Sequence, residues 1–191
     1  YEIPLRLVGS EMCIRDSNNQ MQMLWGAVDN TDENNLMRRF GTCLVTYSLE
    51  GKPGDDTYMK LISRNDDFND HTLGYGDTMW EDEDGHTYLY TTSNYKVAVA
   101  RTATHDLSSQ WEYYVADPQG NFSWTTEYPS TQDAEYSTII PLESGCSMPW
   151  VFKKGDTYYM IGQSIWFGRD VLMFRSKHPY LSLIHISEPT R

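Results

Sequence analysis

One pattern constrains the fold of this chain more than any other: two similar strand–turn–strand segments lie 70 residues apart. The segments are 80–90 and 150–160. Four residues recur at matching places, and Trp80, Gly85, Thr87 and Tyr88 correspond to Trp150, Gly155, Thr157 and Tyr158. Repeated units of four antiparallel strands are typical of a β-propeller. The alternative is a chance similarity between two hairpins.

The repeat continues into the next predicted strand. Val97 and Arg101 recur 74 residues on, as Val171 and Arg175, after the slightly longer loop 164–170. A unit of about 70 residues exceeds the 40–50 that are usual for small propeller blades. We therefore predict large blades, in which Trp80 and Trp150 pack between neighbouring units.

Runs of alternating apolar and β-branched residues between turn clusters predict strands, and no convincing amphipathic helix is visible. The predicted strands are 21–28, 40–49, 57–63, 77–81, 86–92, 95–103, 111–116, 137–142, 147–152, 157–163 and 171–176. We expect 76–81 and 147–152 to be the innermost strands of two blades. The acidic run 82–85 is interpreted as a solvated hairpin turn.

Composition narrows the function classes. Aromatic residues make up 14% of the chain, which favours pleated, half-buried strands. The net charge of −12 would repel phosphate backbones, so nucleic acid is not an expected partner. No apolar run is long enough for a membrane span. Neither the histidines nor the cysteines have metal-ligand spacing, and no metal or cofactor is expected.

Both ends of the chain resemble translated sequencing-adapter read-through, in segments 1–17 and 181–191. We exclude such segments from the prediction of the fold. The remainder divides into a partial blade with its connection at 18–75, a blade at 76–136 and an incomplete blade at 137–180. Of the cysteines outside the two end segments, Cys43 and Cys146 are each predicted to be a small buried side chain rather than half of a disulfide.

The repeat also resembles a known superfamily. The strings 80–85, 88–90, 97–101 and 111–114 are similar to blades of five-bladed glycoside hydrolases, which include arabinanases and β-xylosidases. Residues 74–77 look closer still to uncharacterised bacterial relatives of those enzymes. The resemblance implies an all-β fold, a fragment of a five-bladed β-propeller with about two to two and a half blades. It also implies a carbohydrate partner and a secreted or periplasmic location.

The chemistry implied by the resemblance needs carboxylates on the inner strands. Asp77, at the start of one inner strand, is the candidate catalytic carboxylate, and a turn-capping Asp is the alternative. The family's general-acid Glu falls at Ser147, and Glu143 is the nearest carboxylate that could replace it. Ser147 itself becomes a candidate for substrate binding.

Two further residues are candidates for sugar contacts. Trp166 lies in the loop 164–170, where an indole could stack on a sugar ring, and Gln163 could hydrogen-bond a hydroxyl group. Three functions stay open: a glycoside hydrolase that acts on polysaccharide, a non-catalytic carbohydrate-binding propeller, and a protein-interaction scaffold.

Overall fold

The computed structural model describes residues 6–7, 12–15, 19–29, 38–52, 54–56, 58–69, 73–166, 168–180 and 184–186. These residues form three antiparallel sheets and one short helix. We call the sheets A, B and C in chain order. Most of the two adapter-like end segments lies outside the described residues, and the exceptions are three short strands named below.

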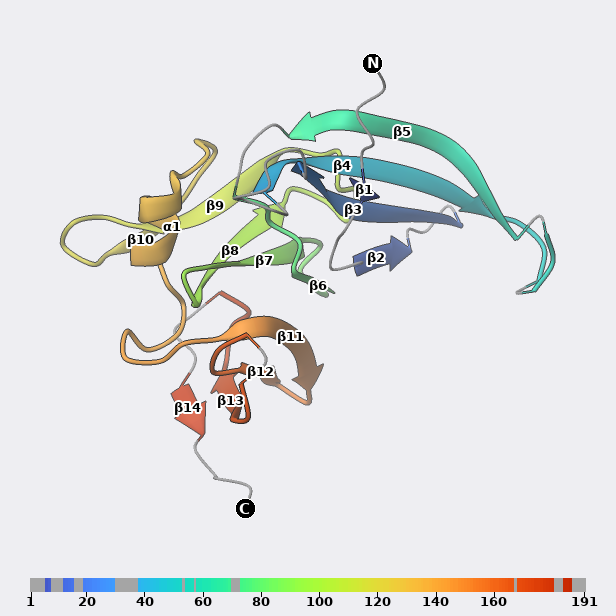
Figure 1. Cartoon of the computed structure of the whole chain (residues 1–191). Coiled ribbons are helices and arrows are strands. Elements are labelled where there is room, and N and C mark those ends of the chain that lie inside the picture. The colour runs from blue at the N-terminus through green and yellow to red at the C-terminus, as the bar shows by residue number, and fades with distance from the viewer. Residues whose placement is uncertain are drawn as a thin grey trace.

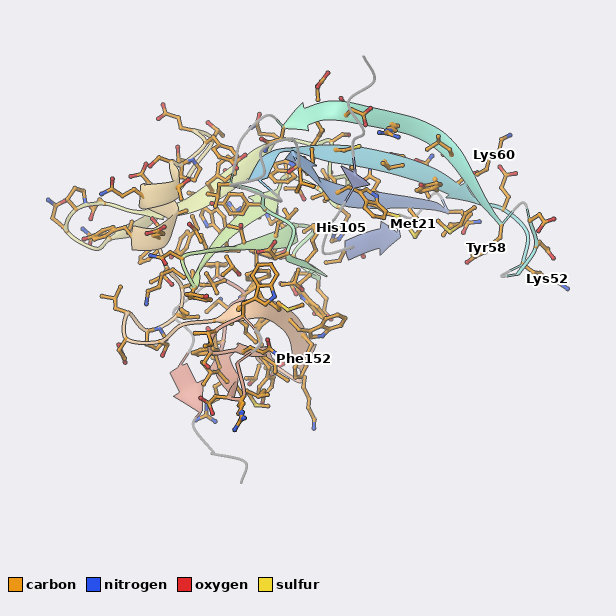
Figure 2. All side chains as sticks on the ribbon, in the orientation of Figure 1. Met21, Lys52, Tyr58, Lys60, His105 and Phe152 are labelled. Atoms are coloured by element: carbon orange, nitrogen blue, oxygen red, sulfur yellow. The ribbon has the colours of Figure 1, made fainter. Side chains whose placement is uncertain are left out.

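Sheet A contains the first long strands of the chain. It consists of β3 (Gln20–Asp29), β4 (Arg38–Leu49) and β5 (Met59–Asn69), with β1 (Arg6–Leu7) and β2 (Met12–Arg15) both paired to β3. Figure 2 shows Lys52, Tyr58 and Lys60 at the tip of the β4–β5 hairpin, away from Phe152 of sheet C.

Sheet B is a meander in which every strand pairs with the next one in the chain. Its strands are β6 (Thr78–Glu81), β7 (Thr87–Ser93), β8 (Lys96–Thr102), β9 (Trp111–Ala116) and β10 (Phe122–Thr125). Helix α1 (Thr131–Tyr136) follows, with a capping box between Ser130 and Asp133. Its one buried side chain, Ala134, packs into the apolar cluster of this sheet.

Sheet C repeats the meander. It consists of β11 (Ser147–Lys154), β12 (Thr157–Gln163), β13 (Val171–Ser176) and β14 (Ile184–Ile186). Sheet B lies between sheets A and C (Figure 1). Alternate side chains of β7 and β8 enter two different apolar clusters, so sheet B is buried on both faces. Consecutive meander sheets packed face to face are the blades of a propeller. The predicted fold class, an all-β propeller fragment, is confirmed.

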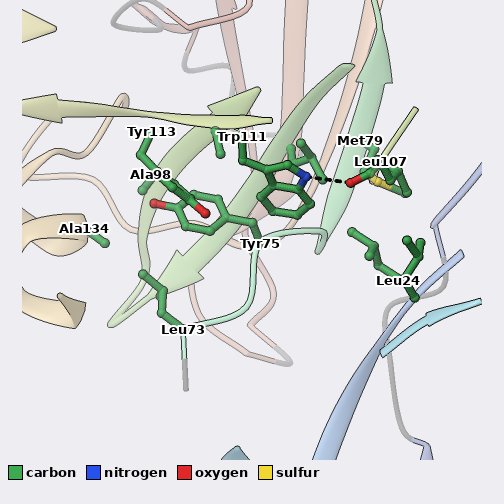
Figure 3. Close-up of a cluster of buried hydrophobic side chains, with 12 residues drawn as sticks. Leu24, Leu73, Tyr75, Met79, Ala98, Leu107, Trp111, Tyr113 and Ala134 are labelled. Atoms are coloured by element: carbon green, nitrogen blue, oxygen red, sulfur yellow. Dashed lines mark hydrogen bonds between the residues drawn. The ribbon is translucent and has the colours of Figure 1, made fainter. Parts of the chain in front are cut away.

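The cluster between sheets A and B joins Leu24 and Leu44 to Leu89 and Ala98. Figure 3 shows this cluster, including the hydrogen bond that the Trp111 indole N–H donates to the carbonyl oxygen of Leu107.

A polar contact fixes the register between these two sheets. The buried Gln22 side chain of β3 donates to Asp106 Oδ1 at 2.8 Å and accepts the backbone N–H of Leu107 at 2.8 Å. Both hydrogen-bonding ends of this amide are therefore satisfied across the interface.

The cluster between sheets B and C joins Tyr88, Tyr90, Val97 and Val99 to side chains of β11, β12 and β13. The Tyr90 hydroxyl donates to the carbonyl oxygen of Pro179 at 2.8 Å. Towards the outer strands the interface is filled by larger rings, and Tyr114, Phe122, Trp124 and Tyr180 contact one another there.

The structure corrects three local predictions. Helix α1 and strand β10 were not expected, and 137–142 is not a strand. Ile139 and Ile140 in that segment are nevertheless buried, and the Ile139 N–H donates to the carbonyl oxygen of Val97. Their apolar pattern reflects burial against β8 rather than membership in a sheet.

The hairpin register differs between the two repeats. Trp80 pairs with Tyr88, whereas Trp150 pairs with Ile161 and not with Tyr158. The cause is turn length, because β6 and β7 are joined by residues 82–86 and β11 and β12 by Gly155 and Asp156 alone. Trp80 packs against the B–C cluster as predicted, while Trp150 is 60% exposed.

Candidate functional site

Four segments meet at one end of sheets B and C, and we call this region the loop end. It comprises residues 76–77 before β6, the β7–β8 turn at 94–95, residues 144–147 around the start of β11, and residues 163–164 at the end of β12. The backbone N–H of Cys146 donates to the carbonyl oxygen of Tyr95 at 2.8 Å. The Lys96 ammonium donates to the carbonyl oxygens of Leu142 and Ser144. The start of sheet C is thereby held against sheet B.

Asp77 is half-buried at the start of β6. Its Oδ2 accepts the backbone N–H of Thr92 at 2.7 Å, and its own N–H donates to the carbonyl oxygen of Tyr90. The preceding Gly76 has φ +120°, and a Cβ there would lie 3.1 Å from Leu24 Cδ1. The carboxylate is thus fixed to the neighbouring strand β7, 15 residues on in the chain.

Ser147 and Gln163 lie directly opposite each other across the β11–β12 pair. Ser147 is 6% exposed and Gln163 is half-buried. The adjacent Gly162 permits this approach, because a Cβ there would lie 2.3 Å from Cys146 Sγ and 2.9 Å from the Ser147 carbonyl oxygen. Any larger residue at position 162 would separate the two strands.

Trp166 follows Gln163 by three residues, and 59% of it is exposed. Its loop is closed by a hydrogen bond from Ser164 N–H to the Asp170 carbonyl oxygen and by another from Gly168 N–H to Ile165. Trp166 therefore lies in a closed loop that directly follows the end of β12.

Glu143 lies in the connection that leads into β11, and its side chain is exposed. The turn around it is closed by a hydrogen bond from Ser144 N–H to the Pro141 carbonyl oxygen. Within the described ranges, no hydrogen bond or ion pair to the Glu143 carboxylate is found. Its connection is positioned through Lys96 and not through Glu143 itself.

Two features of the loop end were missed in the sequence. Met148 has φ +51° at an irregularity between β11 and β12, and its side chain is 63% exposed. Asn94 and Tyr95 also have positive φ, as a two-residue hairpin turn requires. Asn94 was a usable turn signal, whereas nothing about a Met indicates left-handed backbone.

Neither Cys43 nor Cys146 is suited to nucleophilic chemistry. Burial raises the pKa of Cys146 to about 12. Burial, helped by a hydrogen bond to Asp66, raises the pKa of Cys43 to about 11. Across the described ranges, no group of three His, Cys, Asp or Glu side chains is placed to hold a metal ion.

Residues 9–181 match the family model described as "Domain of unknown function (DUF5005)". The chain belongs to this family. Among curated proteins no match is found.

The solved structures include a strong relative of the DUF5005 chain. A protein from Bacteroides ovatus ATCC 8483, provisionally described as a hydrolase, is 86% identical with a TM-score of 0.86. The match covers 91% of this chain and 43% of that chain, so the chain spans less than half of the relative.

Two further solved structures are far more distant. A GH43_1 enzyme from Xanthomonas citri is 9% identical with a TM-score of 0.37, over 96% of this chain and 74% of that chain. CoXyl43, a β-xylosidase/α-arabinofuranosidase from a compost metagenome, is 10% identical with a TM-score of 0.36, over 96% and 78%. No helix in the described part of the DUF5005 chain is long and apolar enough to cross a membrane.

Proposed function

We propose that the loop end binds a carbohydrate, and that the longer DUF5005 protein is a carbohydrate-active propeller. The observation that carries this proposal is the exposed indole of Trp166, three residues after Gln163, which itself pairs with Ser147 across β11 and β12. An aromatic face, an amide and a hydroxyl together are the groups that can recognise a sugar ring and its hydroxyls.

Each group has a distinct part in binding. The indole offers a large, rigid apolar face together with one N–H donor. The Gln163 amide can both donate and accept hydrogen bonds, as can the Ser147 hydroxyl. Because the chain has a net charge of −12, we expect neutral glycans to bind better than those rich in carboxylates or sulfates.

Hydrolysis is the second candidate function, and two observations favour it. Asp77 presents a carboxylate from an inner strand at the same end of the molecule. The Bacteroides ovatus relative, 86% identical over the matched region, is provisionally described as a hydrolase. Glycoside hydrolysis requires a second carboxyl group across the scissile bond. Since Ser147 occupies the position implied for the general acid, binding is the function that these residues support best.

A glycan panel tests the proposal. Purified chain is titrated with neutral oligosaccharides, including xylo- and arabino-oligosaccharides, by calorimetry. Trp166→Ala should weaken binding about five- to tenfold through the lost stacking contact. Tyr136→Ala is the matched control, because that ring is 55% exposed on α1, and it should leave the affinity unchanged. Equal affinity for the wild type and Trp166→Ala would refute the site.

Hydrolysis is tested separately on the longer Bacteroides ovatus relative, with the substitution at the position aligned with Asp77. Asp77→Asn keeps a side-chain oxygen that can accept the Thr92 N–H, so the fold should survive while a catalytic carboxylate is lost. Release of reducing sugar by the wild type but not by the variant supports the enzyme. Equal turnover by both removes Asp77 from the mechanism, and binding without turnover supports the non-catalytic alternative.

A further inference from the structure

Tyr95 is an unusual residue for the place that it occupies. It is the second residue of the two-residue turn between β7 and β8, which is closed by the pairing of Ser93 with Lys96. Its φ is +62°, in the left-handed region that such a turn requires and that Gly adopts most readily. A bulky aromatic residue is strained in this conformation. Gly at position 95 would therefore relieve the backbone.

Another two-residue turn, in sheet C, shows the ordinary arrangement. Strands β11 and β12 are joined by Gly155 and Asp156 alone, and Gly155 has a φ of +58°. At the turn of sheet B, by contrast, 40% of Tyr95 is exposed. Among the described residues, no hydrogen-bond partner of the Tyr95 hydroxyl is found. Neither full burial nor a polar contact of this side chain offsets the strain, and strained residues of this kind gather at functional sites.

The backbone around Tyr95 is built into the loop end. The Tyr95 carbonyl oxygen accepts the N–H of Cys146 at 2.8 Å, which ties the turn to the segment that leads into β11. Gly145 lies between this turn and the end of β12, because a Cβ added there would lie 3.3 Å from Tyr95 Cβ and 2.9 Å from the Ser164 carbonyl oxygen. Tyr95 and Ser164 therefore lie on two sides of one residue without a side chain.

Ser164 joins Tyr95 to the groups that we propose to bind a sugar. It directly follows Gln163 and precedes Trp166 by two residues. The loop end thus carries two exposed aromatic residues on different sheets, Tyr95 from sheet B and Trp166 from sheet C. Each offers a rigid apolar ring with a polar edge.

We infer that Tyr95 is a second sugar-stacking residue of the loop end, and that the ligand is an oligosaccharide rather than a single sugar. This inference rests on the proposed carbohydrate binding. Because one aromatic side chain covers about one sugar ring, two such residues from separate sheets engage two units of a chain. The Tyr95 hydroxyl can donate and accept hydrogen bonds with the sugar hydroxyls. The ring is then the reason why this turn has a strained Tyr in place of Gly.

Tyr95→Gly tests the inference, because it should change stability and binding in opposite directions. Relief of the strain should raise the Tm by about 1–4 °C, after the added chain entropy of glycine. Loss of the ring should weaken the binding of a neutral trisaccharide, measured by calorimetry, about five- to tenfold. Tyr95→Asn removes the ring but tolerates left-handed backbone, and its affinity should fall equally. Tyr95→Phe keeps the ring and should bind within about twofold of the wild type.

The outcomes separate this inference from the proposed function. If Trp166→Ala weakens binding while Tyr95→Gly and Tyr95→Asn bind like the wild type, the second stacking residue is refuted and the carbohydrate site stands. If the wild type binds no oligosaccharide, both are refuted. A lowered Tm in Tyr95→Gly would also overturn the inference, because the ring would then be retained for packing.

Discussion

Asp82 belongs to the β6–β7 turn, yet it is only 7% exposed. The Tyr158 hydroxyl of sheet C donates to its two carboxylate oxygens, at 2.9 and 2.8 Å, and the Trp80 indole N–H lies 3.2 Å from Oδ1. The Lys153 ammonium is 3.7 Å away. The interpretation of the whole run 82–85 as solvated was therefore wrong for Asp82, because its partner is far away in the sequence.

Tyr158→Phe should lower the free energy of unfolding by about 1.5–3 kcal/mol, since it removes hydrogen bonds to a buried carboxylate. Urea unfolding measures the loss. Tyr159→Phe is the control, because Tyr159 faces the other side of β12 and should cost little. A loss of equal size in both variants would contradict the role of the Asp82–Tyr158 contact.

The same contact predicts a pH dependence. Burial raises the pKa of Asp82, but the hydrogen bonds from Tyr158 and Trp80, together with Lys153, outweigh it, and the pKa lies below 3.8. Because the folded-state pKa is lower than the unfolded-state pKa, the carboxylate contributes stability that is fully present above the unfolded-state pKa and is lost as the pH falls through the folded-state pKa. As the pH falls below about 4, the unfolding free energy should therefore fall less steeply in Tyr158→Phe than in the wild type.

Met148 is strained at the loop end, because left-handed backbone costs a non-glycine residue about 1–2 kcal/mol. Met148→Gly should raise the unfolding free energy by about 0.5–1 kcal/mol, after the added chain entropy of glycine. Met148→Ala keeps the strain and should show no gain. A destabilised Met148→Gly would mean that the exposed side chain stabilises the fold by packing.

At the scale of elements, the close approach of β11 and β12 depends on Gly162. Gly162→Ala should destabilise the protein by about 1–3 kcal/mol, because its Cβ would clash with Cys146 Sγ. Cys146→Ala in the same chain should recover part of that loss. Purely additive effects in the double-mutant cycle would contradict the clash.

The strands could be predicted because alternation and turn residues are local signals. The ten strands β3 to β9 and β11 to β13 were found in this way, apart from shifts at their ends. Strand β10 and helix α1 were missed because each has few residues and its apolar side chains pack mainly against other elements. The register of β11 on β12 differs from that of β6 on β7, because turn length overrides the spacing of similar residues.

The candidate site was only partly accessible from the sequence. Ser147 was named from the family resemblance, and Gln163 and Trp166 from the extra loop. The structure pairs Ser147 with Gln163 across β11 and β12. Two sets of contacts could not be predicted, because they depend on strand pairing, which composition does not reveal. They are the hydrogen bond from the Thr92 N–H to the Asp77 carboxylate and the hydrogen bonds from Lys96 to the carbonyl oxygens of Leu142 and Ser144.

At the scale of the whole molecule, the stacking of the sheets determines which of their faces are buried. Sheet B lies between two neighbours and buries both faces, while Trp150 and Val171 of sheet C are exposed. The loop end is assembled from two sheets, so its geometry depends on how well those sheets are packed. Substitutions that loosen the packing of the B–C cluster should therefore weaken glycan binding, although the substituted residues do not contact the sugar.

The most direct test of carbohydrate binding follows the indole N–H signals of the six tryptophans by nuclear magnetic resonance while a binding oligosaccharide is added. Trp166→Phe assigns one signal. We expect a saturable shift of the Trp166 signal. The signal of Trp111, whose indole N–H donates to the carbonyl oxygen of Leu107, should not move. No saturable shift at Trp166, or larger shifts at Trp80 and Trp111, would contradict a sugar site at the loop end.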